Sequence, residues 1–485
     1  MIARQTAGTL SAQDPYLAMR PMILALMRKG DHKGAITHLQ GAFAAYGCQS
    51  ELIADMVTCY WHLGEEVGAI KLMEAVTEDS SATADALAKV GSMHLSIGDI
   101  EKARTALTRA IALRPGFVGA IVALNQIQPY PKDGHGVRTV RKLLKSGKVT
   151  RQEKSSLHGV LGRVEEASGG YALSLAHYAR SRGLIPGTYD PNKIQIQVER
   201  QIASYDPGNC PVEGQAPAGP RVVFIVGMPR SGTTLVESIL LRHPDVTSIG
   251  ESNALEECLA QWRLMLDGSD EWNCLSTMTD PVAAKLRSVY FAVAKRGRGL
   301  GQSDVIVDKT PLNMLHLGFA RAIFPDCRFI CMSRHPLDVG LSNFGAAFSK
   351  AFVSANPFLK DLEQIGHYSR WGWASILDYQ KKLRTGFRLQ SYRRLVENGE
   401  SETRKLVAHV GLNWNPDCLQ PERRAGRIAT ASVLQVRSPI HGRRLGRWKV
   451  YGDSVQPLVD GFGGWPRISE WENHDEMACN AIDIH

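Results

Sequence analysis

The chain has 485 residues, of which 44% are hydrophobic and 22% are charged. This composition is typical of a folded globular protein and excludes a largely disordered one, and the length predicts two or three domains. The formal charge of +9 suits an anionic ligand as well as a nucleic acid, but no run of Lys and Arg is long enough to predict DNA or RNA binding.

The cysteines and the apolar segments indicate a reducing compartment. The nine cysteines are scattered and odd in number, so they do not indicate a disulfide framework. Cys327 and Cys331 have no second pair at zinc-ligand spacing, and we expect core thiols there. The first twenty residues lack the apolar core of a signal peptide, and no run of about 18 apolar residues occurs. We therefore expect a cytoplasmic protein without a membrane span.

A period of 34 residues runs through the N-terminal part of the chain. Gly30, Gly64 and Gly98 lie at this interval, and an alanine follows each of them five residues later. Small residues at fixed places let the two helices of a hairpin approach closely, and 34 residues is the tetratricopeptide period. Residues 1–190 resemble a tetratricopeptide solenoid. The alternative for this region is a generic helical bundle.

The resemblance to a solenoid implies a partner. Repeat solenoids present a concave groove that usually holds a peptide or a protein, and such domains often pair as homodimers. The pattern is weaker near the end of this region, since residues 155–184 form only a looser copy and residues 129–147 lose the motif. Residues 185–220 are rich in Pro, Gly, Asn and Asp, which predicts a linker at 191–219.

Short apolar runs alternate with longer helix-compatible stretches in the second half. The runs lie at 222–226, 305–307, 328–332 and 387–389. Strands that alternate with helices predict a three-layer α/β domain with a parallel sheet, here over residues 220–475. In such domains the ligand binds at the carboxyl ends of the strands.

A glycine-flanked turn, Gly-Met-Pro-Arg-Ser-Gly-Thr-Thr-Leu at 227–235, follows the first of these runs. A turn between a strand and a helix points backbone N–H groups at one spot and predicts a site for a phosphate-like anion. Gly227 and Gly232 have the spacing of a P-loop, but Thr233 stands where the nucleotide-hydrolysing pattern has Lys. Arg230 supplies a positive charge from inside the loop.

Further cationic and hydroxyl residues follow the next two predicted strands. Lys309, in an Asp-Lys-Thr-Pro segment, can place its ammonium near the loop. Arg334 ends the next strand, and Ser342 lies two helical turns further on and could point its hydroxyl the same way. A guanidinium together with a hydroxyl is suited to a second phosphate.

These motifs together resemble the sulfotransferase family over about residues 217–475. The resemblance implies 3′-phosphoadenosine 5′-phosphosulfate as the sulfuryl donor and requires no metal. It implies that Arg334 and Ser342 bind the 3′-phosphate. Many members have Asp after this Arg where the chain has His335, but we still expect the following helix to form. The 5′-phosphosulfate would be held by Arg230, Ser231, Gly232, Thr233 and Thr234.

Two later segments resemble the protein-tyrosine sulfotransferase branch. Tyr392 begins a segment similar to the Tyr-Glu-x-Leu-Val of the family, whose Tyr lies close to the nucleotide, although Arg393 replaces the usual acid. Ser432 precedes Pro439 in a segment similar to one whose Ser contacts the sulfuryl donor. Ser438 stands where that segment carries a basic residue.

The reaction that the resemblance implies is transfer of a sulfuryl group to an acceptor hydroxyl, which needs a base. The tyrosine-sulfating branch uses a Glu in a Gly-Glu segment, and Glu251 falls on it, so we expect Glu251 to be the base. His243 is expected to cap or pack the preceding helix end. Arg230 and Lys309 are expected to neutralise charge that builds up on the transferring group and the leaving oxygen.

Three functions stay open at this point. The first is an active sulfotransferase whose acceptor is a peptide, a protein, a glycan or a small alcohol. The second is a scaffold whose repeats bind a partner while the second domain is inactive, and the intact Arg230, Lys309, Arg334 and Ser342 argue against it. The third is a P-loop kinase, which Thr233 in place of the loop Lys disfavours.

Overall fold

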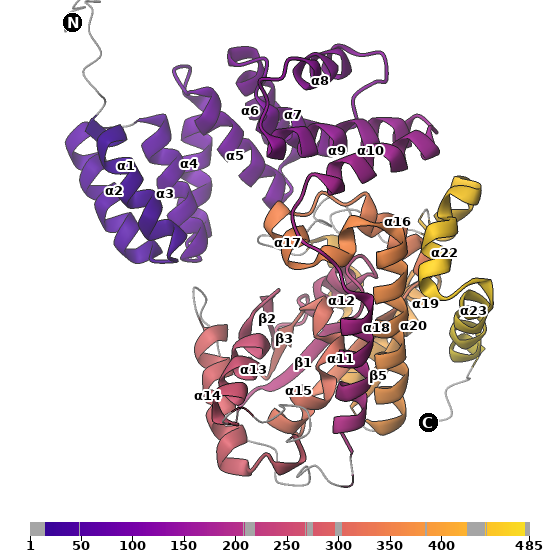
Figure 1. The fold of residues 1–485 in the computed structure, drawn as a ribbon. Helices are drawn as coiled ribbons and strands as arrows, with labels where there is room; N and C mark the ends of the chain where they lie inside the picture. The colour runs from indigo at the N-terminus through magenta and orange to yellow at the C-terminus, as the bar shows by residue number, and fades with distance from the viewer. Residues whose placement is uncertain are drawn as a thin grey trace, which may run out of the picture. The chain divides into compact units, whose positions relative to one another are not determined.

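The computed structural model describes residues 15–47, 49–206, 208, 219–266, 268, 275–295, 303–383, 386–423, 442 and 444–480. The chain forms two compact units, Met1–Ile127 and Gln128–His485. The first is helical, and the second contains a sheet as well as helices (Figure 1). This division lies before the predicted linker at 191–219, so the helices between residues 128 and 204 belong to the second unit.

Helices that each pack on the next form the described part of the first unit. The turn glycines Gly30, Gly64 and Gly98 all have positive φ angles, of 79°, 80° and 85°, a conformation that favours glycine. The alanines five residues after them, Ala35, Ala69 and Ala103, are completely buried. The 34-residue period therefore marks turns between packed helices. These helices are α1 (Pro15–Arg28), α2 (His32–Tyr46), α3 (Ser50–His62), α4 (Glu66–Glu78), α5 (Ala84–Ile97), α6 (Ile100–Leu113) and α7 (Val118–Ile127).

Four helices of the second unit precede its sheet. They are α8 (His135–Lys145), α9 (Arg151–Ala167), α10 (Tyr171–Gly183) and α11 (Pro191–Ser204). Helices α9 and α10 pack against each other, and α11 packs along α18 (Leu362–Lys382). Leu175 of α10 and Val198 of α11 are buried in the same core as the sheet residues, which explains why these helices belong to this unit.

The sheet of the second unit is entirely parallel. Its strands are β1 (Arg221–Val226), β2 (Val246–Gly250), β3 (Val305–Asp308), β4 (Arg328–Ser333) and β5 (Phe387–Ser391), in the order β2-β3-β1-β4-β5. The register pairs Phe224 of β1 with Asp308 of β3 and with Phe329 of β4. The loops that follow β1, β3 and β4 therefore meet at one edge of the sheet.

Helices cover both faces of this sheet, as predicted. Val222, Phe224 and Val226 are buried in one apolar cluster, whereas Val223 and Ile225 are buried in another. Because successive strand residues point to opposite faces, the two clusters lie on the two sides of the sheet. The remaining α-helices are α12 (Thr233–Leu240), α13 (Ala254–Met265), α14 (Asp280–Ala294), α15 (Leu317–Ile323), α16 (Pro336–Phe344), α17 (Lys350–Ala355), α19 (Tyr392–Glu397), α20 (Gly399–His409), α22 (Gln456–Phe462) and α23 (Trp465–Asn480).

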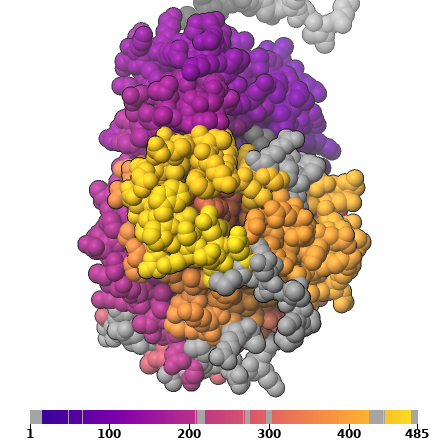
Figure 2. Space-filling view, turned by 90° about the vertical axis from the view of Figure 1, so that its right-hand side faces the viewer, coloured from indigo at the N-terminus to yellow at the C-terminus, as the bar shows by residue number. Residues whose placement is uncertain are grey.

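Short 3-10 helices are also present in the described part of the second unit, and the described residues near its C-terminus lie at the surface. Figure 2 shows these C-terminal residues in yellow beside the orange residues of the preceding helices.

Cys327 and Cys331 are free and completely buried. Among the residues that the structure describes, no helix is both long enough and apolar enough to cross a membrane. The 3-10 helices are η1 (Leu275–Thr277), η2 (Pro311–Leu315), η3 (Pro357–Lys360), η4 (Pro416–Leu419), η5 (Pro421–Arg423) and η6 (Arg447–Val455).

Candidate active site

The loop between β1 and α12 has an unusual backbone. Gly227 and Gly232 have φ angles of 137° and 110°, and among the described non-glycine residues only Arg230 has a positive φ, of 71°. Such a conformation costs a non-glycine residue about 1–3 kcal/mol and persists where the surroundings fix it. A Cβ atom on Gly232 would lie 2.6 Å from the ring of Tyr392, so this position requires glycine.

The loop presents hydrogen-bond donors at the start of α12. The first N–H groups of a helix have no partners within the helix and carry its positive dipole end. Ser231 is buried, and its Oγ makes no hydrogen bond to any described residue. Thr233 and Thr234 are also buried at this helix end. The loop can therefore bind a phosphate-like anion, whose oxygens would satisfy the Ser231 hydroxyl.

Arg230 of this loop lies together with three other predicted site residues, which are Arg334, Ser342 and Tyr392. Arg230 Nε donates a hydrogen bond of 3.2 Å to Ser342 Oγ, from α16. Arg334, which follows β4, donates from Nη1 to the carbonyl oxygen of Arg230 at 3.0 Å. Its guanidinium carbon lies 4.4 Å from the ring centroid of Tyr392. The structure thus groups Arg230 with the residues predicted for the second phosphate.

The electrostatics of this group favour an anion. Burial, together with the positive charges of Arg444 and Arg334, lowers the pKa of Arg230 to about 9. Burial also lowers the pKa of Arg334. Guanidinium groups that are removed from water and lie near one another need a negative partner. A phosphate group suits this arrangement, because Arg binds it with two parallel hydrogen bonds.

Glu251 and Lys309 form a second group. The Nζ atom of Lys309 lies 2.5 Å from Glu251 Oε1, and the Lys309 side chain is 1% exposed whereas that of Glu251 is 41% exposed. The pairing of β2 with β3 produces this contact, since the N–H of Lys309 bonds to the carbonyl oxygen of Gly250. The partly exposed carboxylate of Glu251 therefore forms an ion pair with the buried ammonium of Lys309.

A buried network holds this second group in place. The hydroxyl of Thr310 lies 2.6 Å from Asp308 Oδ1 and accepts the N–H of Ser252 at 3.1 Å. Tyr290 donates to the other Asp308 oxygen at 2.8 Å. Burial raises the pKa of Asp308 to about 6, against the opposing effect of these hydrogen bonds. The network ties the residue after Glu251 to the residues on either side of Lys309.

Two predicted residues have simple structural surroundings. Both ring nitrogens of His243 lie against backbone groups, with Nδ1 accepting from the N–H of Asp245 and Nε2 lying 2.9 Å from the carbonyl oxygen of Asn413. The ring of His335 accepts the N–H of Leu337 at the start of α16, so this helix forms without an Asp at that position. Ser432 lies outside the described residues.

The late segment that begins at Ser432 was predicted as part of the site, but Arg444 within it was not named. Its carbonyl oxygen accepts a hydrogen bond of 3.2 Å from Arg334 Nη2. The Asp338 carboxylate accepts the N–H groups of Gly446 and Trp448 at 2.8 and 2.9 Å, which fixes this segment to α16. The sequence signals for this segment were Ser432, Pro439 and the Arg447-Trp448 pair, and none of them indicated the role of Arg444.

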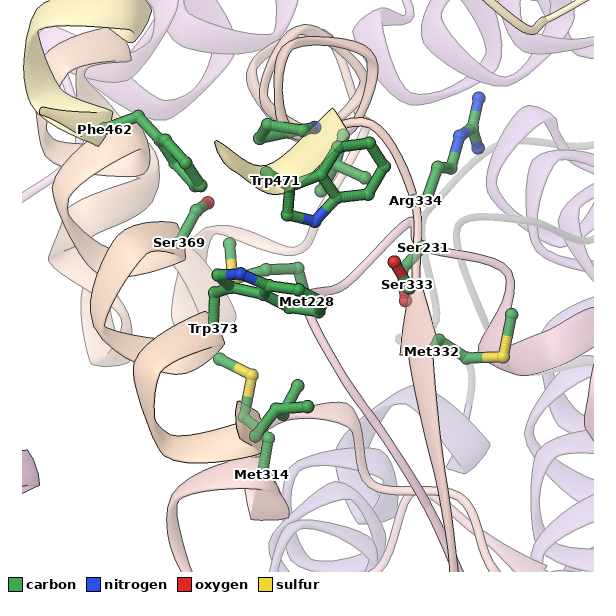
Figure 3. Close-up of a pocket in the computed structure, with 13 residues that line it drawn as sticks. Met228, Ser231, Met314, Met332, Ser333, Arg334, Ser369, Trp373, Phe462 and Trp471 are labelled. Atoms are coloured by element: carbon green, nitrogen blue, oxygen red, sulfur yellow. The ribbon is translucent and has the colours of Figure 1, made fainter. Parts of the chain in front are cut away.

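A small apolar cavity lies beside the loop (Figure 3). Met314, Trp373 and Trp471 line it, and Ser231 and Ser333 approach it from the loop and the end of β4. In the same view the Arg334 side chain points away from the centre of the cavity. Arg334 is nevertheless one of the residues that line the cavity, which therefore adjoins the arginine site.

The fold and the site define an α/β protein with anion-binding groups at one sheet edge. A model described as "Sulfotransferase family" matches residues 220–416. A Caenorhabditis briggsae protein, provisionally named a protein-tyrosine sulfotransferase, is 33% identical over 240 residues, which are 47% of this chain and 80% of that protein. The chain belongs to the sulfotransferase family.

Other similarities cover different parts of the chain. Protein-tyrosine sulfotransferase A of Caenorhabditis elegans is 24% identical over 54% of this chain and 73% of that protein. An uncharacterized protein of Aquifex aeolicus is 27% identical over 81% of this chain, which spans 52% of that relative. The sulfotransferase domain of the Synechococcus PCC 7002 olefin synthase is a structural match with 21% sequence identity and a TM-score of 0.33. The match covers 49% of this chain and 91% of that domain.

Proposed function

We propose that this protein transfers a sulfuryl group from 3′-phosphoadenosine 5′-phosphosulfate to an acceptor hydroxyl. The observation that carries the proposal is the pair of anion-binding groups at one sheet edge. One consists of the loop N–H groups with the buried, unsatisfied Ser231 hydroxyl, and the other of Arg334 with Ser342. A nucleotide with phosphates at both its 5′ and 3′ positions fits two such groups, and the family match supports sulfuryl transfer.

In this mechanism Glu251 takes the proton of the acceptor hydroxyl as its oxygen attacks sulfur. The bond between sulfur and the bridging phosphate oxygen breaks, and adenosine 3′,5′-bisphosphate leaves. The ammonium group of Lys309, which forms an ion pair with the Glu251 carboxylate, stabilises the negative charge that develops on the leaving oxygen. The loop N–H groups and the hydroxyls of Ser231, Thr233 and Thr234 would hold the 5′-phosphosulfate. No described cluster of His, Cys, Asp and Glu could hold a metal ion, and this mechanism uses none.

The acceptor that we propose is a hydroxyl on a peptide or protein. Relatives that carry the name protein-tyrosine sulfotransferase support this choice. The helices of the first unit, with their 34-residue interval, fit a tetratricopeptide array that would hold such a partner. A homodimer and a cytoplasmic location remain expectations from the sequence.

Nucleotide binding separates this function from a kinase. We expect calorimetric titration to show tight binding of adenosine 3′,5′-bisphosphate and no binding of ATP with magnesium. Binding of ATP alone would support the kinase. Transfer of labelled sulfate to peptides, sugars and small alcohols then separates an active enzyme from a scaffold.

A further inference from the structure

Helix α10 lies outside the residues matched by the family model, yet it contacts the end of the helix that carries Ser342. The Arg182 side chain of α10 is buried at this place. Its Nη2 atom donates to the carbonyl oxygens of Asn343, Phe344 and Ala346, at 3.2, 3.2 and 2.7 Å. The last carbonyl groups of a helix have no partners within the helix, and a cation there also opposes the helix dipole. Arg182 therefore stabilises the C-terminal end of α16.

Tyr178 of α10 packs against the same end of α16. Its ring meets the ring of Phe344 edge to face, with the centroids 6.2 Å apart, and a Cβ atom on Gly345 would lie 3.0 Å from it. The Tyr178 hydroxyl donates to Glu166 of α9 at 2.9 Å, and Glu166 also accepts a hydrogen bond of 2.6 Å from Tyr451. The α9–α10 hairpin that presents the guanidinium to α16 is thus itself fixed to the second unit.

The last turn of α16 contacts the loop between β1 and α12 at two adjacent residues. Ser342 Oγ accepts from Arg230 Nε at 3.2 Å. The completely buried Asn343 side chain donates from Nδ2 to the carbonyl oxygen of Pro229 at 2.8 Å. The backbone carbonyl of Asn343 is also one of the three that Arg182 holds. The turn that carries the Ser342 hydroxyl therefore lies between the anion-binding loop and the Arg182 guanidinium.

We propose that Arg182 is a positioning residue, which holds Ser342 in place for the 3′-phosphate. The inference rests on the proposed function, in which Ser342 and Arg334 bind that phosphate. Without the guanidinium, three carbonyl oxygens lose a donor, and the last turn of α16 shifts or frays. The loop keeps its place, because the N–H of Gly227 is bonded to the carbonyl oxygen of Pro311 at 3.0 Å. The hairpin before the family-matched residues then contributes to recognition of the nucleotide.

The test compares two nucleotides that differ only in the 3′-phosphate. We expect Arg182→Gln to weaken calorimetric binding of adenosine 3′,5′-bisphosphate about fivefold or more, and that of adenosine 5′-monophosphate less than about twofold. Arg182→Lys keeps the charge but lacks the planar guanidinium, and we expect an intermediate loss of about threefold for the bisphosphate. Arg180→Gln removes an exposed arginine from the same helix and should change neither affinity.

A double variant tests whether Arg182 acts through Ser342. Ser342→Ala removes the hydroxyl that Arg182 is proposed to position. Adding Arg182→Gln to Ser342→Ala should lower the affinity for the bisphosphate by less than about twofold further, since changes that act by one route are not additive. Full additivity of the two losses would overturn the positioning role, because Arg182 would then act independently of Ser342.

The outcomes distinguish this inference from the function on which it rests. If the unaltered protein does not bind the bisphosphate, the proposed function fails and the role of Arg182 fails with it. If the unaltered protein binds, and Arg182→Gln binds equally well or loses affinity equally for both nucleotides, only the role of Arg182 is overturned. Thermal unfolding curves check that each variant is folded. If Arg182→Gln does not fold, Arg182→Lys decides, and an unchanged ratio of its two affinities overturns the role.

Discussion

At the residue scale, the contact between Glu251 and Lys309 defines what both side chains can do. A buried ammonium needs a counter-charge, and the Glu251 carboxylate provides it while much of its own side chain faces solvent. An acceptor that approaches from solvent therefore meets the carboxylate before the lysine. This order is what a base beside a leaving-group cation requires.

Replacing Glu251 by Gln tests the assignment of the base. We expect kcat for sulfuryl transfer to fall about 10²–10⁴-fold, because the amide cannot take the proton of the hydroxyl. Affinity for adenosine 3′,5′-bisphosphate should be nearly unchanged. Glu256→Gln, an exposed change on the next helix, should leave both values as they are. A turnover for Glu251→Gln close to that of the unaltered protein would mean that another group is the base.

Local patterns predicted most of the candidate site residues, whereas others are brought together only by long-range packing. Ser231, Arg334 and Ser342 lie in short motifs next to predicted strands, so they could be proposed from their neighbours in the sequence. Arg444 was not predicted as a site residue, and only the folded chain brings its carbonyl oxygen to Arg334. The contact of Arg230 with Ser342 was also not predicted, because a backbone with positive φ at Arg230 redirects its side chain.

At the element scale, the turn between β1 and α12 depends on Gly232. We expect Gly232→Ala to weaken binding of the bisphosphate at least about tenfold, since the Cβ would force Tyr392 or the loop to move and the φ angle disfavours alanine. Gly399→Ala is the matched control, because that glycine begins α20 without a positive φ and nothing lies within 4 Å of the added Cβ. Calorimetry on both variants gives the comparison, and equal affinities would contradict this role for the turn.

Asp55 links three helices of the first unit. It is completely buried and bonds to Tyr16 and Arg20 of α1, at 2.6 and 2.7 Å, and to Lys89 of α5. We expect Asp55→Ala to lower the free energy of unfolding by on the order of 2 kcal/mol, less than for a fully buried pair because Arg20 and Lys89 are partly exposed. Asp85→Ala breaks an exposed pair with Arg114 and should cost less than about 1 kcal/mol. Urea unfolding curves measure both values, and equal losses would contradict the account.

The pH dependence of this link follows from the pKa of Asp55. Burial alone would raise that pKa, but Lys89, Arg20 and Tyr16 outweigh it and hold the pKa below its ordinary value. The folded state therefore binds a proton less readily than the unfolded state. The stabilisation is complete above the ordinary Asp pKa and is lost as the pH falls through the lower, folded value. Asp55→Ala should accordingly cost less at strongly acidic pH than at neutral pH.

The sequence predicted four of the five strands that the structure describes, but not β2. Strands β1, β3, β4 and β5 contain the predicted apolar runs. Strand β2, Val-Thr-Ser-Ile-Gly, contains polar residues because it lies at the edge of the sheet and has a neighbour on one side only. Because of these polar residues, the sequence did not predict β2, the strand that places Glu251 beside Lys309.

At the scale of the whole molecule, the helical first part and the parallel-sheet second part were both predicted. The compact units divide at residue 127, whereas the composition of the chain predicted a linker at 191–219. The difference arises because a run rich in Pro and Gly marks a loop, but buried contacts decide which unit a helix joins. Helix α10 contacts the core of the second unit through Tyr178 and Arg182, and helix α9 contacts Tyr451 and Arg447 through Glu166.

Sulfuryl transfer to an acceptor can be measured directly with a labelled donor. Purified protein is incubated with 3′-phosphoadenosine 5′-[³⁵S]phosphosulfate and a panel of tyrosine-containing peptides, sugars and small alcohols. Label on the acceptor and release of adenosine 3′,5′-bisphosphate are measured together. We expect labelled acceptor and free bisphosphate in equal amounts with at least one hydroxyl acceptor, and we expect Glu251→Gln to abolish most of both. Tight binding of the bisphosphate with neither label transfer nor bisphosphate release across the panel would contradict the proposed activity and favour the scaffold.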